Sequence, residues 1–150
     1  MAKFYSTKTY GNDRGLSCCF RQWRASHSHC STLHGYSIGI KLIFECSTLD
    51  DKNWCMDFGG LKEFKAWADS MFDHTMIIAE DDPFLEPFKK MNDAGVAQIR
   101  ILPATGAEKF AEYIFNKLNP FIKAETDNRV RVTKVKFMEH GKNAAYYTED

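Results

Sequence analysis

Three histidines and one cysteine lie within eight residues of this chain, at positions His27, His29, Cys30 and His34. The remaining 142 or so positions hold only two more histidines, so the cluster is far denser than the composition would give by chance. Neutral imidazole is the commonest protein ligand for zinc, and a thiolate can act as ligand, nucleophile or base. The cluster therefore predicts a metal site beside a reactive thiol.

The strands expected around the cluster sharpen this prediction. Residues 15–29 and 34–46 read as two strands joined by a tight turn. On such a hairpin His27 and His29 leave the same face of the first strand, and His34 opens the second strand beside them. Three histidines with an open fourth position form a catalytic zinc site, so we predict Zn²⁺ held by this set. The alternative is an exposed polar turn whose histidines bind nothing.

Cys30 lies in the turn, next to the predicted metal. A nearby cation and histidines would favour the thiolate form of this side chain, which makes it the candidate nucleophile or base. Two alternatives remain open from the residues alone. Cys30 is either a fourth zinc ligand in a purely structural site or an inert small residue.

Two further positions offer acid–base or binding chemistry. Asp73 stands beside His74 after an expected helix, and a carboxylate next to an imidazole orients it and prepares a general base. Glu139 lies near the end of an apolar strand, where its carboxylate can accept two parallel N–H bonds from an amino-pyrimidinone ring. The structural alternatives are a polar helix end and a solvated strand end. Glu108 is explained as a capping-box residue and is not predicted to be catalytic.

The elements that must position these residues follow from periodicity. Alternation of apolar and polar residues over 36–46 predicts a half-buried antiparallel strand, and Asp57 can cap the helix that follows. In chain order the expected elements are strands over 15–29 and 34–46 with a turn over 30–33, a helix over 60–72, a short helix between Pro83 and Gly95 with its apolar residues inside, a strand over 96–102, a helix from a capping box at Thr105 to Leu118, and a hairpin of strands over 129–139 and 144–148. This order predicts an α+β fold with helices on one face of an antiparallel sheet.

Composition sets the broad class. The 150 residues fit one domain, and 20 basic residues balance 20 acidic ones, so no nucleic-acid surface is expected. The five cysteines are odd in number and include an adjacent pair, and we find no signal peptide, which predicts a reducing, cytoplasmic setting. No apolar run approaches the roughly 20 residues of a membrane helix, so no membrane partner is expected.

Taken together, the motifs resemble those of the 6-pyruvoyl- and 6-carboxy-tetrahydropterin synthase family. The resemblance covers about residues 17–148 and is specific in combination. The matching segments are Trp23-Arg24-Ala25-Ser26-His27, Cys30-Ser31-Thr32-Leu33-His34-Gly35, Met56-Asp57-Phe58-Gly59-Gly60-Leu61-Lys62, Asp73-His74, the turn and helix start from Thr105 to Ala111, and Glu139 followed seven residues later by Tyr146. The first fourteen residues extend beyond it, and Phe4 and Tyr5 are compatible with an additional edge strand.

The resemblance implies a single T-fold domain over residues 1–150, with a four-stranded antiparallel sheet, two helices on one side, and assembly into trimers or hexamers with active sites between subunits. It implies a lyase acting on 7,8-dihydroneopterin triphosphate, with Zn²⁺ polarising the side chain of the substrate. Cys30 would move the side-chain proton, Asp73 and His74 would form a second relay, and Glu139 would anchor the pterin. Because Cys30 is retained, the 6-carboxy type of the queuosine pathway is the expected member.

The chain departs from the family pattern at two places. Tyr36 stands where the family has its third zinc histidine, and only Ser28 and His29 separate His27 from Cys30. We therefore expect His29 to supply the missing imidazole. Three alternatives stay open: a pyruvoyl-forming enzyme, a side-chain-cleaving enzyme, and a non-catalytic T-fold protein that binds a pterin or purine.

Overall fold

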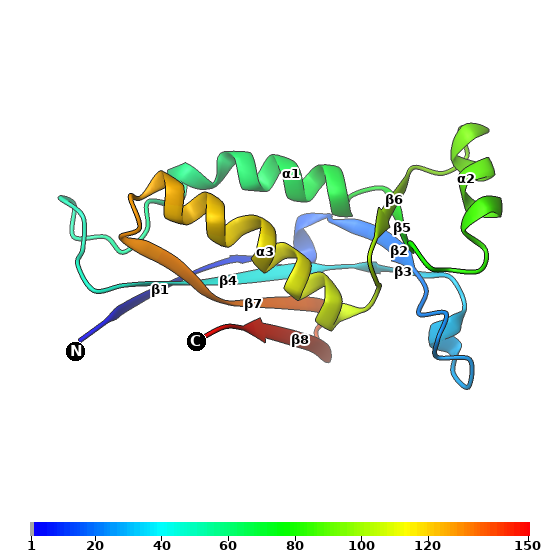
Figure 1. Ribbon diagram of the computed structural model, residues 1–150, viewed down its shortest axis with the longest axis horizontal. Coiled ribbons are helices and arrows are strands. Elements are labelled where there is room, and N and C mark those ends of the chain that lie inside the picture. The colour runs from blue at the N-terminus through cyan, green and yellow to red at the C-terminus, as the bar shows by residue number, and fades with distance from the viewer. Residues whose placement is uncertain (1) are drawn as a thin grey trace.

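The computed structural model describes residues 2–150 and contains two sheets with helices packed on one side (Figure 1). The strands are β1 (Phe4–Tyr10), β2 (Ser17–Phe20), β3 (His34–Ser37), β4 (Gly39–Cys46), β5 (Thr75–Ala79), β6 (Ile99–Leu102), β7 (Val130–His140) and β8 (Asn143–Thr148). The α-helices are α1 (Lys62–Phe72), α2 (Leu85–Asp93) and α3 (Ala107–Glu125), and short 3₁₀ helices cover Asn12–Arg14, His29–Ser31 and Phe58–Leu61.

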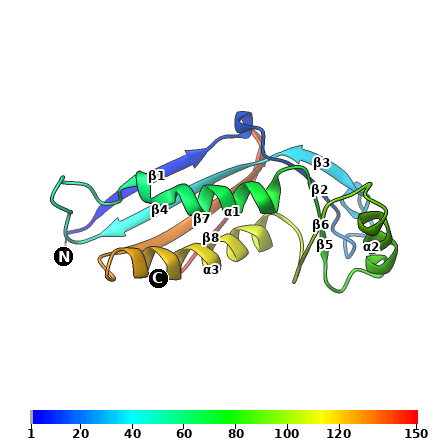
Figure 2. The same cartoon turned by 90° about the horizontal axis from the view of Figure 1, so that it is seen from above.

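The larger sheet is antiparallel, with strand order β1-β4-β7-β8. Its inner face is lined by alternating apolar residues that are fully buried, such as Leu42, Phe44 and Val135. The helices α1 and α3 lie side by side over this face (Figures 1 and 2) and present apolar stripes to it, including Phe64 and Ile114. Burial of this face supplies the main core of the protein.

The smaller sheet has strand order β3-β2-β5-β6 and lies at one end of the larger one (Figure 2). β2 and β3 pair antiparallel, whereas β2, β5 and β6 run parallel. All five residues of β5 are buried, as expected for the central strand of a sheet covered on both faces. The loop after β2, the loop before α2 and the loop before α3 all gather at this end.

The predicted α+β class and the four-stranded antiparallel sheet with two helices on one face are confirmed. The predicted first strand, over 15–29, is wrong beyond Phe20, because residues 21–28 form successive turns. In the larger sheet β4 pairs with β7 on one side and on the other with β1, which begins at the Phe4-Tyr5 pair. Beyond that pair, no strand was predicted within the first fourteen residues.

The predicted strand over 34–46 is divided at Ile38 into β3 and β4, which belong to different sheets. Gly39 lets the chain pass closely over its neighbours where it moves from one sheet to the other. A Cβ at this position would approach the Met138 methyl to 2.8 Å and the Tyr10 carbonyl to 3.0 Å. The apolar alternation continues across the division, so periodicity alone predicts one continuous strand. The consequence is that β3 carries His34 away from the larger sheet and beside β2.

Three helical details also differ from expectation. The capping box at Thr105 is absent: α3 starts after Gly106, whose φ is +116°, and no side chain caps it. The Thr105 hydroxyl instead donates to the Arg21 carbonyl at 2.6 Å. α3 continues through Pro120 to Glu125. The apolar residues expected inside the short helix are largely exposed, with Phe84 at 55%. The strand β5 was not predicted, and β6 is shorter than expected.

Across residues 2–150 the structure contains no helix that is long and apolar enough to cross a membrane.

Candidate functional site

Tyr36 is the centre of the polar cluster that contains most of the predicted chemistry. It lies on β3, two residues after His34, so both side chains leave the same face of the strand. The pKa of the Tyr36 phenol is raised, first by burial and then by the nearby Glu139 carboxylate and Cys30 thiol. Its ring also lies 5.8 Å from that of His140. The Tyr36 side chain therefore contacts His34 on its own strand and lies beside the end of β7.

His34 is held in place by both of its ring nitrogens. Nδ1 lies 2.6 Å from the Thr32 carbonyl, and Nε2 lies 2.8 Å from the Tyr36 hydroxyl. Because a carbonyl only accepts, this arrangement places the proton on Nδ1 and leaves Nε2 to accept from Tyr36. A backbone carbonyl thus orients the imidazole, as is common for histidines that bind metals. The other ring nitrogen, Nε2, accepts a hydrogen bond from the Tyr36 phenol.

Glu139 reaches the cluster from the end of β7. Burial raises the pKa of its carboxyl, the Glu108 carboxylate raises it further, and His140 and His34 act in the opposite direction. Glu108 stands in the first turn of α3 and is not engaged in capping. The predicted capping-box role of Glu108 is wrong, because no side chain caps α3. That Glu108 is not catalytic stays a prediction.

Cys30 lies in the 3₁₀ helix His29–Ser31, between β2 and β3. Ser28 caps this turn by accepting a bond from the Cys30 amide at 3.1 Å, and the Ser31 hydroxyl donates back to the Ser28 carbonyl at 2.8 Å. The Cys30 carbonyl accepts from the Gln22 amide at 2.7 Å. These bonds fix the backbone of the turn, and the thiol is half-buried beside Tyr36.

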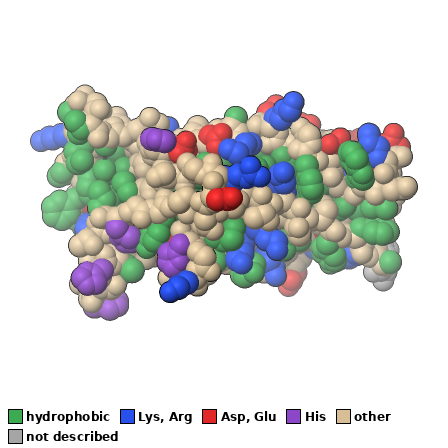
Figure 3. Space-filling view, turned by 180° about the vertical axis from the view of Figure 1, so that it is seen from behind, with side chains coloured by type: hydrophobic (Ala, Val, Ile, Leu, Met, Phe, Trp, Pro, Cys, Tyr) green, Lys and Arg blue, Asp and Glu red, His purple; other side chains and the backbone are tan. Residues whose placement is uncertain are grey.

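The three predicted zinc ligands lie in different local structures. His27 is in a turn, His29 begins the 3₁₀ helix, and only His34 is on a strand, so the same-face argument for His27 and His29 does not apply. Within residues 2–150 no group of three or more His, Cys, Asp or Glu side chains lies close enough to hold a metal ion. Figure 3 shows histidine side chains gathered on the surface at this end of the molecule. The conformation therefore does not fit a three-histidine zinc site.

Asp73 and His74 form the predicted pair, with Nδ1 of His74 2.9 Å from Oδ1 of Asp73. His74 has a left-handed backbone, with φ of +57°, and its side chain is 85% exposed. Its amide donates to the Ser17 carbonyl at 2.6 Å, whereas Cys30 lies beyond the Phe20 end of β2. Tyr36 pairs with Cys18 from the other side of β2, one residue from Ser17. Within residues 2–150 neither Asp73 nor His74 forms a hydrogen bond with Cys30, Tyr36 or Glu139.

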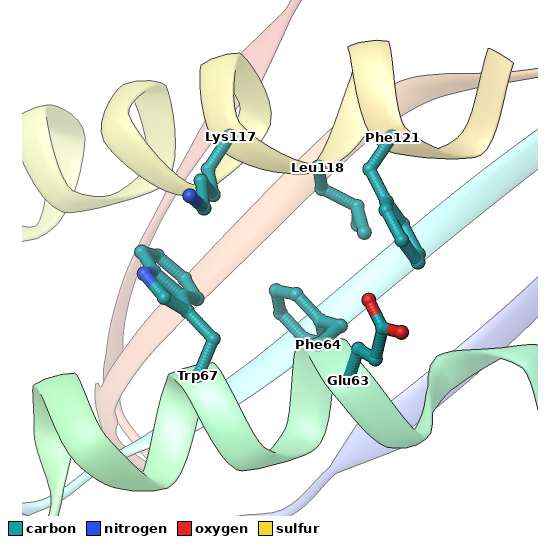
Figure 4. Close-up of a pocket in the computed structure, with 6 residues that line it drawn as sticks. All are labelled: Glu63, Phe64, Trp67, Lys117, Leu118 and Phe121. Carbon is teal, nitrogen blue, oxygen red and sulfur yellow. The ribbon is translucent and has the colours of Figure 1, made fainter. Parts of the chain in front are cut away.

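The structure has hollows whose linings do not include Tyr36. A hollow of about 390 Å³ is lined by residues of the three loops, among them Gln22, His27 and Thr105. Another, of about 310 Å³, lies between α1 and α3 (Figure 4) and is lined by Glu63, Phe64, Trp67, Lys117, Leu118 and Phe121. None of the predicted site residues lines this second cavity, so the candidate chemistry lies elsewhere.

Comparison with known sequences decides the family. A sequence profile described as 6-pyruvoyl tetrahydropterin synthase matches residues 12–150. The chain belongs to this family. Two relatives in it are named 6-carboxy-5,6,7,8-tetrahydropterin synthase. The one from Rickettsia typhi is 28% identical over 112 residues, covering 73% of this chain and 78% of the relative. The one from Aquifex aeolicus is 27% identical over 125 residues, covering 81% and 76%.

Solved structures of the 6-pyruvoyl tetrahydropterin synthase family share the fold. The 6-pyruvoyl tetrahydropterin synthase of Plasmodium vivax superposes with a TM-score of 0.70 at 17% identity, covering 98% of this chain and 99% of that one. An uncharacterized protein from Wolinella succinogenes superposes with a TM-score of 0.84 at 19% identity over the whole of both chains. At these identities the likeness establishes the T-fold.

Proposed function

We propose that this chain is a 6-carboxy-5,6,7,8-tetrahydropterin synthase, a carbon–oxygen lyase that acts on 7,8-dihydroneopterin triphosphate in the cytoplasm and feeds the queuosine pathway. One observation carries the proposal: the Tyr36 hydroxyl bonds to His34, its ring lies 5.8 Å from that of His140, which follows Glu139, and Glu139 and Cys30 both raise the Tyr36 pKa. In this proposal Cys30 is the proton-transfer group and Glu139 is the pterin-binding carboxylate of one site. The names of the Rickettsia and Aquifex relatives support the 6-carboxy assignment.

In this proposal each side chain has one task. Glu139 accepts two parallel N–H bonds from the amino-pyrimidinone ring and fixes the pterin beside Tyr36. Cys30 takes a proton from the substrate side chain, and the triphosphate leaves by elimination. Asp73 orients His74, which carries the second proton. His34 and Tyr36 present a hydrogen-bonded pair to the side chain of the substrate.

The separation of Asp73 and His74 from Cys30 indicates how the site is completed. Because the His74 side chain is exposed and bonds to Asp73 rather than to Cys30 or Tyr36, we propose that a neighbouring subunit supplies the pair in a trimer or hexamer. Mixing Cys30→Ala with His74→Ala tests this assembly. Each variant alone is expected to be inactive, whereas the dissociated and reassembled mixture regains part of the activity. No regain on mixing would place the relay within one chain.

Zn²⁺ is part of the proposal, with His27, His29 and His34 as its ligands. When bound, the metal would polarise the hydroxyl and carbonyl groups of the substrate side chain. The conformation described here does not assemble the three imidazoles, so metal content decides the point. We expect His29→Ala to lose bound zinc and His74→Ala, an exposed histidine away from the cluster, to keep it. Full metal occupancy in His29→Ala would remove His29 from the ligand set.

Product analysis tests the activity itself. Zinc-replete protein is incubated with 7,8-dihydroneopterin triphosphate and the products are identified by mass spectrometry. We expect 6-carboxy-5,6,7,8-tetrahydropterin. A pyruvoyl product or a cleaved side chain would replace the 6-carboxy assignment with one of the related activities.

A second candidate function is a non-catalytic T-fold protein that binds a pterin or purine. It is favoured by one observation: the Tyr36 hydroxyl occupies Nε2 of His34, the nitrogen that a metal would need. This function predicts no product in the same incubation, together with pterin binding that is lost in Glu139→Gln. Both candidates use the same carboxylate, so turnover, not binding, separates them.

A further inference from the structure

Arg21 directly follows β2 and joins three loops at the end of the smaller sheet. Its guanidinium donates two parallel bonds to Asp82, from Nε at 2.8 Å and from Nη2 at 2.7 Å. Its third nitrogen, Nη1, donates to the Ser31 carbonyl at 3.0 Å. The Arg21 carbonyl accepts the bond from the Thr105 hydroxyl at 2.6 Å. One residue thus ties the Cys30 turn to the loops that precede α2 and α3.

The Arg21–Asp82 pair is not an ordinary surface ion pair. The Asp82 side chain is 1% exposed and that of Arg21 17%. The hydrogen bond from Arg21 is the main reason that the pKa of the Asp82 carboxyl is lowered, and the Phe84 amide donates to the same carboxylate at 2.9 Å. A planar guanidinium held at both edges has little freedom, so the Nη1 donor is fixed in direction.

The Cys30 turn depends on this fixed donor. The carbonyl of Cys30 is held by the Gln22 amide, and the carbonyl of the next residue, Ser31, is held by Arg21. Both anchors come from consecutive residues at the end of β2. The other bonds of the turn run to Ser28 and Thr32, and the Thr32 carbonyl in turn accepts a bond from His34 on β3. Gln22 and Arg21 therefore tie the turn that carries the thiol to the end of β2.

We infer that Arg21, locked by Asp82, is a positioning residue that keeps the Cys30 sulfur in reach of the substrate beside Tyr36. The inference rests on the proposed role of Cys30 as the proton-transfer group. It goes beyond that role because neither Arg21 nor Asp82 touches the site and neither belongs to the motifs that carry the family resemblance. A displacement of the reacting group by about 1 Å can cost about 100-fold in rate.

The chain offers a matched control at the far end of the larger sheet. Arg131 on β7 forms a bidentate pair with Glu45 on β4, from Nε at 3.1 Å and from Nη2 at 3.2 Å. Glu45 is also largely buried, with its side chain 10% exposed. This pair has the same chemistry as the Arg21–Asp82 pair but contacts none of the three loops. Arg131→Gln therefore reports what the loss of a partly buried arginine does to stability alone.

The test compares Arg21→Gln with Arg131→Gln in the zinc-replete protein. For Arg21→Gln we expect kcat to fall about 100-fold with KM little changed, because the pterin-binding carboxylate is untouched. We also expect iodoacetamide to alkylate Cys30 faster, as read by peptide mass spectrometry, since the turn is released. Arg131→Gln is expected to keep both kcat and the alkylation rate of the folded protein.

A second variant guards against simple unfolding. Arg21→Gln leaves a buried carboxylate unpaired, which is strongly destabilising, whereas the double variant Arg21→Gln/Asp82→Asn removes that charge. We expect the double variant to recover thermal stability but not kcat, because Ser31 still lacks its donor. Recovery of kcat together with stability, or unchanged Cys30 alkylation in Arg21→Gln, would show that Arg21 serves the fold only. The alkylation readout needs no substrate, so it remains decisive if the wild-type protein forms no product.

Discussion

The two sheets of this protein divide its stability from its chemistry. The larger sheet is wholly antiparallel, its strands reach eleven residues, and two helices bury its inner face. The smaller sheet has strands of four or five residues in mixed directions, and it is extended by polar loops held by side-chain bonds. Long paired strands give a rigid base, whereas short strands with bonded loops place reactive side chains at their ends. Substitutions in the two regions should therefore fail in different ways.

The largest expected effect is on stability, from Phe44→Ala in the larger sheet. Phe44 is fully buried on β4, far from the Tyr36 cluster, and its truncation leaves a cavity under α1 and α3. We expect a loss of about 3–5 kcal/mol in the free energy of unfolding, measured by chemical denaturation. The exposed Tyr146 on β8 is the control, and its change to alanine should cost less than about 0.5 kcal/mol. A Phe44→Ala protein that stays folded but loses turnover would break the division between the sheets.

The next effect is on turnover, from Cys30→Ala in the smaller sheet region. Loss of the proton-transfer group should lower kcat about 10²–10⁴-fold, as for other general acid–base groups. The melting temperature should change little, because the half-buried thiol fills no core site. Cys19→Ala, a half-buried cysteine on β2, is the matched control and should retain turnover. Equal activity in the two variants would remove Cys30 from the mechanism.

Glu139 lies where the two sheets meet, and Glu139→Gln should change pterin binding and protein stability in opposite directions. The loss of a charge-assisted pair of bonds is expected to weaken pterin binding about 10–100-fold, measured by calorimetry. The stability change has the opposite sign. Burial raises the pKa of Glu139, so the folded state holds this proton to higher pH than the unfolded state. Stability is therefore lost as pH rises through the folded-state pKa, and glutamine avoids that loss.

A stability gain for Glu139→Gln that is larger at pH 8 than at pH 4 would support this account. A variant that is destabilised at both values would mean that the carboxylate is satisfied by its neighbours and that its raised pKa has another origin. Glu108→Gln is the companion variant, because the repulsion between the two carboxylates contributes to the shift. This variant should lower the pKa of Glu139 and make the free energy of unfolding less dependent on pH.

The division between the sheets also decides what the sequence could predict. The strand β4 shows the period-2 pattern and was predicted from it, because burial of one face imposes that pattern, and β7 and β8 were predicted as a hairpin. The spacing of His27 and His29 looked like a strand but is part of consecutive turns. Local bonds from Ser28 to Ala25 and from Ser31 to Ser28 satisfy that backbone without a partner strand.

The site was predicted in its residue types and not in its centre. Cys30, His34 and Glu139 were chosen for their chemistry, and their roles stay predictions. Tyr36 departs from the family pattern, and the structure bonds its hydroxyl to His34 and places its ring beside that of His140. Its role depends on β3 lying beside the end of β7, a contact between residues about 100 positions apart that no local pattern encodes. Arg21 was missed for the same reason, since its partner Asp82 lies in a distant loop.

The smallest expected effect is a difference in acid sensitivity between the two arginine–carboxylate pairs. The hydrogen bond from Arg21 lowers the pKa of Asp82, so the stability that this pair contributes is present above the unfolded-state pKa and is lost as pH falls through the folded-state value. Glu45 behaves likewise: burial acts to raise its pKa, but bonds from Arg131 and Lys3 outweigh it and lower the pKa. Both Asp82→Asn and Glu45→Gln should flatten the fall in unfolding free energy between neutral and acid pH. Only Asp82→Asn should also change the alkylation rate of Cys30, because only the Arg21–Asp82 pair is bonded to the turn that contains Cys30. Equal effects of the two variants on the thiol would mean that the turn does not depend on Arg21.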